Sequence, residues 1–172
     1  MPKLTDAERD AFLDEEGILM RIATVDPDSR PLVVPIWFIR VDDEICFTPR
    51  QASEWLGHIR ENPNVALCID EQNAPYRKVV VRGRARIVHE LGEDDAWREL
   101  YRRIARRYVP PEAADGYVDV TDDQRRALLA VSLPDSEVRS WRMPLEGENY
   151  KGIWADRYYT SDAKIRKLTS DV

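Results

Sequence analysis

The chain has 172 residues, of which 43% are hydrophobic and 34% are charged. This length and composition predict a single domain with one sizeable core, and they exclude two ordinary domains. The net charge of −6 and the isoelectric point near 5.1 argue against a general nucleic-acid-binding protein, because such proteins usually carry a basic face.

The apolar runs are all shorter than the roughly 20 residues that a transmembrane helix needs, and the N-terminal sequence MPKLTDAERD is charged. We therefore expect a cytoplasmic protein with no membrane contact. The two cysteines, Cys46 and Cys68, lie within apolar β-type runs and show neither CxxC spacing nor a nearby ligand cluster. They are predicted to be buried structural thiols, with no metal site.

The first third of the chain combines one helix with several β-type runs. Residues 5–15 are predicted to be helical because Thr5 and Glu8 have the spacing of a capping box, and Gly17 ends this helix. Residues 18–25 and 32–41 are predicted strands, separated by the turn sequence DPDSRP. A hairpin turn at 42–43 then leads into a short strand over residues 44–48.

A polar loop and a second helix follow. Ser53 has the character of an N-cap for a helix that runs to about Asn62 and is closed by Pro63. Strands are predicted over 65–70 and 78–88, with the polar loop EQNAPY between them. Gly83 lies inside the second of these strands and indicates a bulge or a bend at a barrel corner.

Beyond residue 90 the hydrophobic period changes from two to about 3.6, which predicts an amphipathic helix ending at Tyr108. A further short helix is expected over residues 111–120, and closing strands over 127–133 and 137–141. We divide the chain into a barrel domain, residues 1–142, and a C-terminal tail, residues 143–172. The aromatic residues of that tail predict that it packs on the barrel or on a partner subunit.

The order of these elements resembles the pyridoxamine 5′-phosphate oxidase-like FMN-binding split-barrel superfamily over roughly residues 12–142. The matching pieces are ATVDPDSRPLVVPIWF, FT followed by a Ser-led helix ending in NP, VALCID, and PYRKVVVRGRARIV. The PY element and the Asn-Pro pair resemble most closely the actinobacterial branch that uses flavin or the deazaflavin F420. The expected fold is mainly β with peripheral helices, arranged as a split β-barrel.

The resemblance implies a homodimer with two identical cofactor sites at the subunit interface, with FMN as the cofactor or F420 as the alternative. By position, the backbone of one strand would line the flavin ring, and the next strand and loop would reach the ribityl chain and the phosphate. Lys78 matches a position that contacts the ring in relatives. The cofactor-binding residues carried over in this way are Pro35, Ile36, Trp37, Phe38, Phe47, Thr48, Ser53 and Lys78.

One departure from the family pattern concerns the phosphate. Relatives usually carry a basic pair just after the serine, where this chain has Glu54 and Trp55. Arg50 is the nearest substitute for binding the phosphate, or else a solvated loop residue. Trp55 either packs in the core or at the dimer contact, or stacks on a cofactor ring. Trp141 ends the last strand, and it either packs in the core or takes part in the cofactor site.

The remaining conspicuous residues are weaker signals. His58 and His89 are interpreted as structural, because neither has a convincing Cys or carboxylate partner for a metal. Four arginines of the sequence YRRIARRY lie about one helical turn apart in pairs, at positions 102, 103, 106 and 107. This cluster is interpreted as a solvated face, or as a site for the acidic tail of F420.

The resulting hypothesis is an FMN- or F420-dependent oxidoreductase that transfers hydride equivalents to or from a small conjugated or aromatic substrate. No catalytic side chain is identified, because the redox chemistry would belong to the cofactor. The alternative is a non-enzymatic protein that holds flavin or haem on the same barrel for storage or sensing, since one fold hosts several functions.

Overall fold

The computed structural model describes residues 2–148, and the part of the tail prediction that concerns residues 149–172 falls outside them. The described chain is mainly β, as predicted. Its strands are β1 (Met20–Val25), β2 (Pro31–Ile36), β3 (Phe38–Val41), β4 (Glu44–Phe47), β5 (Asn64–Asp70), β6 (Lys78–His89), β7 (Leu128–Ser132) and β8 (Glu137–Trp141). Its α-helices are α1 (Asp6–Asp14), α2 (Glu54–Glu61), α3 (Arg98–Arg106) and α4 (Pro111–Val120), with a 3-10 helix at Asp94–Ala96.

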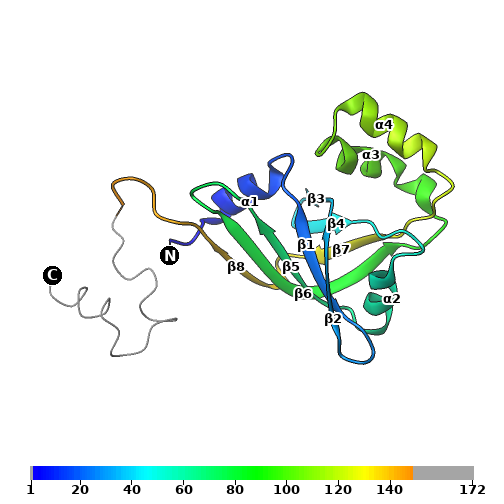
Figure 1. The fold of residues 1–172 in the computed structure, drawn as a ribbon, viewed down its shortest axis with the longest axis horizontal. Coiled ribbons are helices and arrows are strands. Elements are labelled where there is room, and N and C mark those ends of the chain that lie inside the picture. Colours follow the sequence, from blue (N-terminus) through cyan, green and yellow to red (C-terminus); the bar gives the residue numbers. More distant parts are fainter. Residues whose placement is uncertain (1, 149–172) are drawn as a thin grey trace.

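The eight strands form a curled antiparallel sheet, in the order β2-β1-β5-β6-β7-β4-β3, with β8 pairing to β6 off this path. The long strand β6 joins the two halves of the sheet: residues 78–84 pair with β5, and residues 85–89 pair with β7. Helices α2, α3 and α4 lie at the end of the sheet away from the N terminus (Figure 1). The sheet is therefore a half-barrel with its helices at the periphery.

Gly83 lies where β6 changes partners, which confirms the predicted barrel corner. A Cβ atom at this position would lie 2.1 Å from Ser136 Oγ, so a close approach between neighbouring segments requires glycine there. The irregularity in strand register lies further along, between Ile87 and His89. Of the two predicted alternatives at Gly83, the structure therefore shows the corner and not the bulge.

The single extended run predicted over residues 32–41 is divided at Trp37 into β2 and β3. These two strands occupy opposite ends of the strand order, because β2 pairs with β1 whereas β3 pairs with β4. The Trp37 ring stacks on Tyr108, with centroids 5.1 Å apart and planes within 3°. The chain thus crosses from one edge of the sheet to the other at Trp37, which belongs to neither strand.

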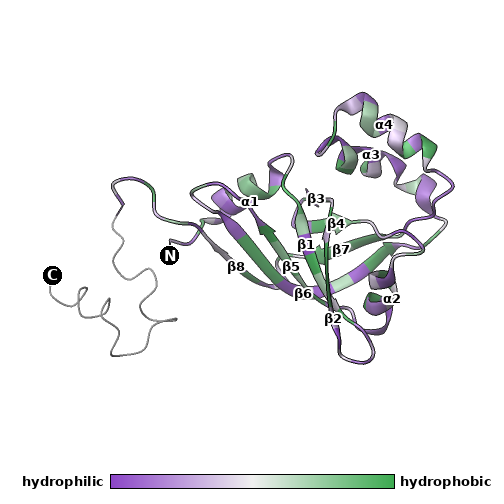
Figure 2. Ribbon diagram, in the orientation of Figure 1, coloured by the Kyte–Doolittle hydropathy of each residue, from purple (hydrophilic) through white to green (hydrophobic). Residues whose placement is uncertain are grey.

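Two hydrophobic clusters hold the fold together. The larger one fills the half-barrel and includes the fully buried rings of Phe12, Phe38 and Phe47. The smaller one lies between the sheet and α3–α4 and includes Trp97 and Tyr101 from the predicted amphipathic face. Hydrophobic residues are concentrated on the strands, while α3 and α4 mix hydrophobic and hydrophilic residues (Figure 2). Within the described part of the chain, each helix is too short or too polar to cross a membrane.

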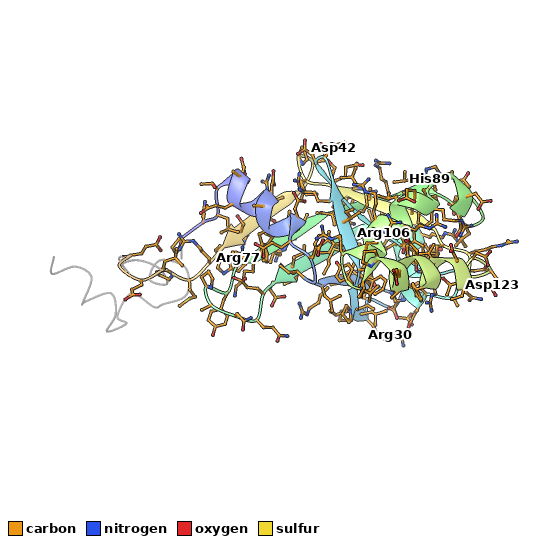
Figure 3. All side chains as sticks on the ribbon, turned by 90° about the horizontal axis from the view of Figure 1, so that it is seen from above. Arg30, Asp42, Arg77, His89, Arg106 and Asp123 are labelled. Atoms are coloured by element: carbon orange, nitrogen blue, oxygen red, sulfur yellow. The ribbon has the colours of Figure 1, made fainter. Side chains whose placement is uncertain are left out.

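Three of the four clustered arginines form hydrogen bonds that connect α3 to α4 or to the end of α1. Arg106, which Figure 3 labels, bonds to Asp115 of α4 at 3.0 Å. Arg102 bonds to Asp119 at 2.7 Å. Arg107 donates to the backbone carbonyls of residues 13 and 15, each at 2.8 Å. The interpretation of this cluster as a solvated face is correct only in part, because these side chains hold α3 against α4 and α1.

Tyr108, just after α3, fastens the helix pair to the strands. Its hydroxyl oxygen accepts a hydrogen bond from the Phe38 N–H at 3.1 Å and donates to the Ile18 carbonyl at 3.0 Å. Burial raises the pKa of this phenol, although hydrogen bonding to Phe38 and the charge of Arg107 act in the opposite direction. Tyr108 therefore combines a ring stack with two hydrogen bonds at the point where β2 gives way to β3.

Replacing Tyr108 by Phe keeps the ring and leaves the Phe38 N–H and the Ile18 carbonyl without this partner. We expect the free energy of unfolding to fall by about 1–3 kcal/mol, measured by urea denaturation. Tyr76→Phe is the matched control, because Tyr76 is exposed and its hydroxyl makes no hydrogen bond within residues 2–148. Equal stabilities of the two variants would contradict this role for Tyr108.

Candidate functional site

A pocket of about 360 Å³ lies between the β2–β3 junction, the loop before α2, and the α3–α4 pair. Seven of the eleven residues predicted to bind a cofactor line it. These are Pro35, Ile36, Trp37, Thr48, Arg50, Ser53 and Trp55, and the other lining residues are Tyr101, Tyr117 and Arg126. The structure therefore brings most of the predicted residues together in one pocket.

The other four predicted residues do not line this pocket. Phe38 and Phe47 have fully buried side chains in the barrel core. Lys78 and Trp141 face each other across β6 and β8, with Lys78 Nζ 5.6 Å from the centre of the Trp141 ring. Within one chain they lie apart from the pocket, so their predicted role in binding a cofactor stays a prediction.

The start of α2 differs from a phosphate-binding helix terminus. Ser53 does not cap α2 through its side chain; its hydroxyl accepts a hydrogen bond from the Arg50 N–H at 3.0 Å. Glu54 places a carboxylate in the first turn, where it already complements the helix dipole. Trp55 is 6% exposed and packs against Phe47, with centroids 6.0 Å apart, so it is mainly a core residue that reaches the pocket.

Sequence reasoning missed three residues of the pocket: Tyr101, Tyr117 and Arg126. Tyr101 could be recognised only as part of an apolar helix face, and Tyr117 lay in a short predicted helix with no distinguishing motif. Arg126 reaches the site because residues 50 and 126 form an antiparallel β-bridge. The flanking hydrogen bonds run from Gln51 N to the residue 125 carbonyl at 2.9 Å and from Ala127 N to the Pro49 carbonyl at 3.2 Å.

The two bridged arginines converge on one phenol oxygen. Arg50 Nη2 donates to Tyr117 Oη at 2.5 Å, and Arg126 Nη2 donates to the same oxygen at 3.2 Å. Among residues 2–148, neither guanidinium has a carboxylate oxygen within the 4.0 Å of an ion pair. The pocket consequently has a strongly positive end.

Arg126 is only 7% exposed, which is unusual for a guanidinium without an acidic partner. Its guanidinium carbon lies 4.4 Å from the centre of the Tyr101 ring. The Nε of Arg126 and the Nε1 of Trp97 have no partner among the described residues. Both residues line a second cavity of about 10 Å³, which has room for one water molecule.

Aromatic rings from the β2–β3 junction and from α3–α4 meet at the pocket. Trp37 stacks on Tyr108 and meets Tyr117 edge-on at 5.8 Å, and Tyr117 lies 6.4 Å from Tyr101. Apolar ring surfaces with a few polar groups are typical of sites that hold a flat organic ligand. The arrangement can therefore orient a ring system against Trp37 and an anion against the arginines.

The two tyrosines at the positive end have opposite pKa shifts. For Tyr117, partial burial opposes ionisation, but the Tyr101 hydroxyl and the charges of Arg126 and Arg50 outweigh it and lower its pKa. For Tyr101, burial dominates and raises the pKa. Tyr117 is thus the phenol of this site that most readily carries a negative charge.

Other candidate reactive groups lie outside the pocket. Burial raises the pKa of Cys46 to about 11, which suits a structural thiol. Cys68 is only half-buried, so the prediction that both thiols are buried was wrong for this residue. His58 is buried, with its Nδ1 3.0 Å from the Thr24 hydroxyl, in agreement with a structural role. In the described range, 2–148, no group of three or more His, Cys, Asp or Glu side chains could hold a metal ion.

The curled antiparallel sheet with peripheral helices defines a split β-barrel protein. The family described as pyridoxamine 5′-phosphate oxidase matches residues 5–136 of this sequence. The chain belongs to this family, as the resemblance of its sequence motifs had indicated. A search of curated proteins finds no match.

Solved structures share the fold. A conserved hypothetical protein from Mycobacterium tuberculosis aligns with a TM-score of 0.63 at 22% identity, covering 85% of this chain and 92% of that one. An F420 reductase aligns with a TM-score of 0.54 at 24% identity, covering 77% and 94%. An FAD- and haem-binding protein from Mycobacterium smegmatis aligns with a TM-score of 0.60 at 21% identity, covering 84% and 74%.

The Tyr101 hydroxyl and the paired guanidiniums together should make Tyr117 ionise below the ordinary tyrosine pKa of about 10. We expect the tyrosinate absorbance of the ligand-free protein to show one early step as the pH rises. Arg126→Gln should move that step to higher pH, and Tyr117→Phe should abolish it. If the early part of the titration were the same in Tyr117→Phe and wild type, the assignment to Tyr117 would be wrong.

Proposed function

We propose that this pocket binds a flat, phosphate-bearing redox cofactor, with FMN as the first candidate and F420 as the alternative. The protein would then be an oxidoreductase that passes hydride equivalents to or from a small conjugated or aromatic substrate. The observation that carries the proposal is the combination of an aromatic wall with a positively charged end in one pocket.

The residues present fit such a cofactor. Pro35 and Trp37 supply an apolar edge for a ring system, and Arg50 lies where an anionic tail can be bound. The cofactor would supply the hydride chemistry. The chain itself would orient the ring, exclude water and hold the phosphate, so no side chain is required as a strict acid or base.

Comparison with solved structures supports the same class of ligand. One structural neighbour is described as an F420 reductase and another as an FAD- and haem-binding protein. The cytoplasmic location expected from the sequence belongs to this proposal as well.

Trp37→Leu should weaken FMN or F420 binding about tenfold, because it removes a ring surface from the pocket. Titration followed by cofactor fluorescence measures the affinity, and reoxidation of the reduced cofactor by a panel of conjugated ketones and quinones measures the activity. Trp141→Leu is the comparison variant, since Trp141 lies outside this pocket within one chain.

An equal loss of affinity in Trp141→Leu would indicate that the cofactor binds near β6 and β8 instead of in this pocket. Failure of the wild-type protein to bind either cofactor would overturn the enzyme proposal.

Haem binding is the second candidate function, and Tyr117 is the observation that favours it. A phenol with a lowered pKa beside guanidiniums has the character of a tyrosinate haem ligand. Titration with haemin separates the two candidates: tight haemin binding that Tyr117→Phe abolishes, without FMN or F420 binding, would favour a haem-holding protein.

We also propose a homodimer in which a second copy covers the open side of the pocket. On the edge strand β2, alternate residues Pro31, Val33 and Pro35 are exposed, and Val33 is 60% exposed. Because β2 has a partner strand only on the β1 side, this apolar row and its free edge suit a contact between subunits. Pro35 belongs both to this row and to the pocket.

Val33→Asp should raise the dimer dissociation constant at least tenfold, because a charge would replace an apolar contact. Light scattering measures the change in mass, and the cofactor affinity should fall in parallel. Val120→Asp is the matched control, since Val120 is exposed on α4 and does not line the pocket. A monomeric wild type at micromolar concentration would contradict the dimer.

A further inference from the structure

We propose that Arg50, Arg126 and Tyr117 form a receptor for a dianionic phosphate monoester. This site lies on the α4 and pre-β7 side of the pocket and replaces the N terminus of α2 as the place where the anion binds. The inference rests on the proposed function only for the identity of the molecule that carries the phosphate.

The charge balance of the empty site is the first argument. Arg50 and Arg126 are direct partners in an antiparallel bridge, where like charges are unfavourable. Their guanidiniums share a single neutral acceptor, Tyr117 Oη, and no carboxylate among residues 2–148 forms an ion pair with either of them. Within this part of the chain two positive charges are left without compensation, and a ligand with a charge of about −2 would balance them.

The hydrogen-bonding capacity of the site is the second argument. The phenol oxygen of Tyr117 accepts from both guanidiniums, so its own O–H remains available as a donor. Each guanidinium has five N–H donors, of which one is used in this contact. The three terminal oxygens of a phosphate monoester match converging donors of this kind better than the two oxygens of a carboxylate.

Burial makes the site selective. Arg126 is 7% exposed and lies over the Tyr101 ring, so its guanidinium is held in place before any ligand arrives. Hydrogen bonds to an ionised group are stronger where water is excluded. Arg50, by contrast, is exposed and can close on the ligand from the solvent side.

Neighbouring acidic groups do not compete for the two guanidiniums. The Asp94 carboxylate, which is near Arg126 in the smaller cavity, accepts from the Arg126 backbone N–H at 2.8 Å and from the Gly92 N–H at 3.1 Å. Glu54 repels an anion from the first turn of α2. Asp94 therefore leaves the guanidiniums free, and Glu54 favours the arginine pair over the start of α2 as the anion position.

The test uses the ligand-free full-length protein in low-salt, phosphate-free buffer. Isothermal titration with inorganic phosphate, FMN and riboflavin is compared for wild type, Arg126→Gln, Arg50→Gln and Arg125→Gln. Arg125 is exposed, adjacent in sequence and absent from the pocket lining, so its variant is matched in charge change. Because Arg126 is buried, thermal unfolding checks its variant, and the exposed Arg50 supplies an independent test.

We expect phosphate to bind wild type and Arg125→Gln alike and to lose about tenfold or more affinity in Arg126→Gln and Arg50→Gln. If these two variants also lose the preference for FMN over riboflavin, the cofactor carries the phosphate. If they keep that preference but no longer bind phosphate beside FMN, the site holds the phosphate of a substrate.

Unchanged phosphate affinity and unchanged FMN preference in both variants would overturn the proposal. An equal loss in Arg125→Gln would also overturn it, because only net charge would then matter. Phosphate binding that depends on Arg126, in a protein that binds neither flavin nor F420, would leave this inference standing and remove the proposed function. The two claims therefore fail separately.

Discussion

The contact between Trp37 and Tyr108 is the constraint on which the rest of the site depends. It occurs where the chain leaves one edge of the sheet and starts the other, and the Tyr108 hydroxyl ties the same point to two backbone groups. Because Tyr108 follows α3 directly, this contact places the α3–α4 pair over the junction. Together with the smaller hydrophobic cluster, it holds this wall of the pocket on the sheet.

The pocket is assembled from parts of the chain that are far apart in sequence. Residues 35–37 provide an apolar floor, residues 48–55 provide a polar loop, and residues 101–126 provide aromatic rings and a buried guanidinium. The β-bridge between residues 50 and 126 joins the last two parts through their backbones. The positive end therefore depends on backbone pairing as much as on the choice of side chains.

Local sequence patterns were sufficient for most of the fold. Alternating and 3.6-residue periods located the strands and helices, since each element buries one face, and the corner at Gly83 followed from glycine within a strand. The division at Trp37 was missed because β-type residues continue through it, and only the stack on Tyr108 shows the break. Arg126 was missed for a similar reason. Its bridge partner, Arg50, lies 76 residues earlier, and a contact over that distance leaves no pattern in the local sequence.

The floor and the aromatic wall of the pocket belong to different hydrophobic clusters. Its floor belongs to residues that pack on the barrel core, such as Ile36 and Trp55, whereas its aromatic wall belongs to the cluster under α3–α4. Because local unfolding often follows such boundaries, we expect the α3–α4 pair to open before the barrel unfolds. A ligand that contacts both surfaces would link the two units. Binding in the pocket would then slow amide hydrogen exchange in α3–α4, and loss of the ligand would make it faster.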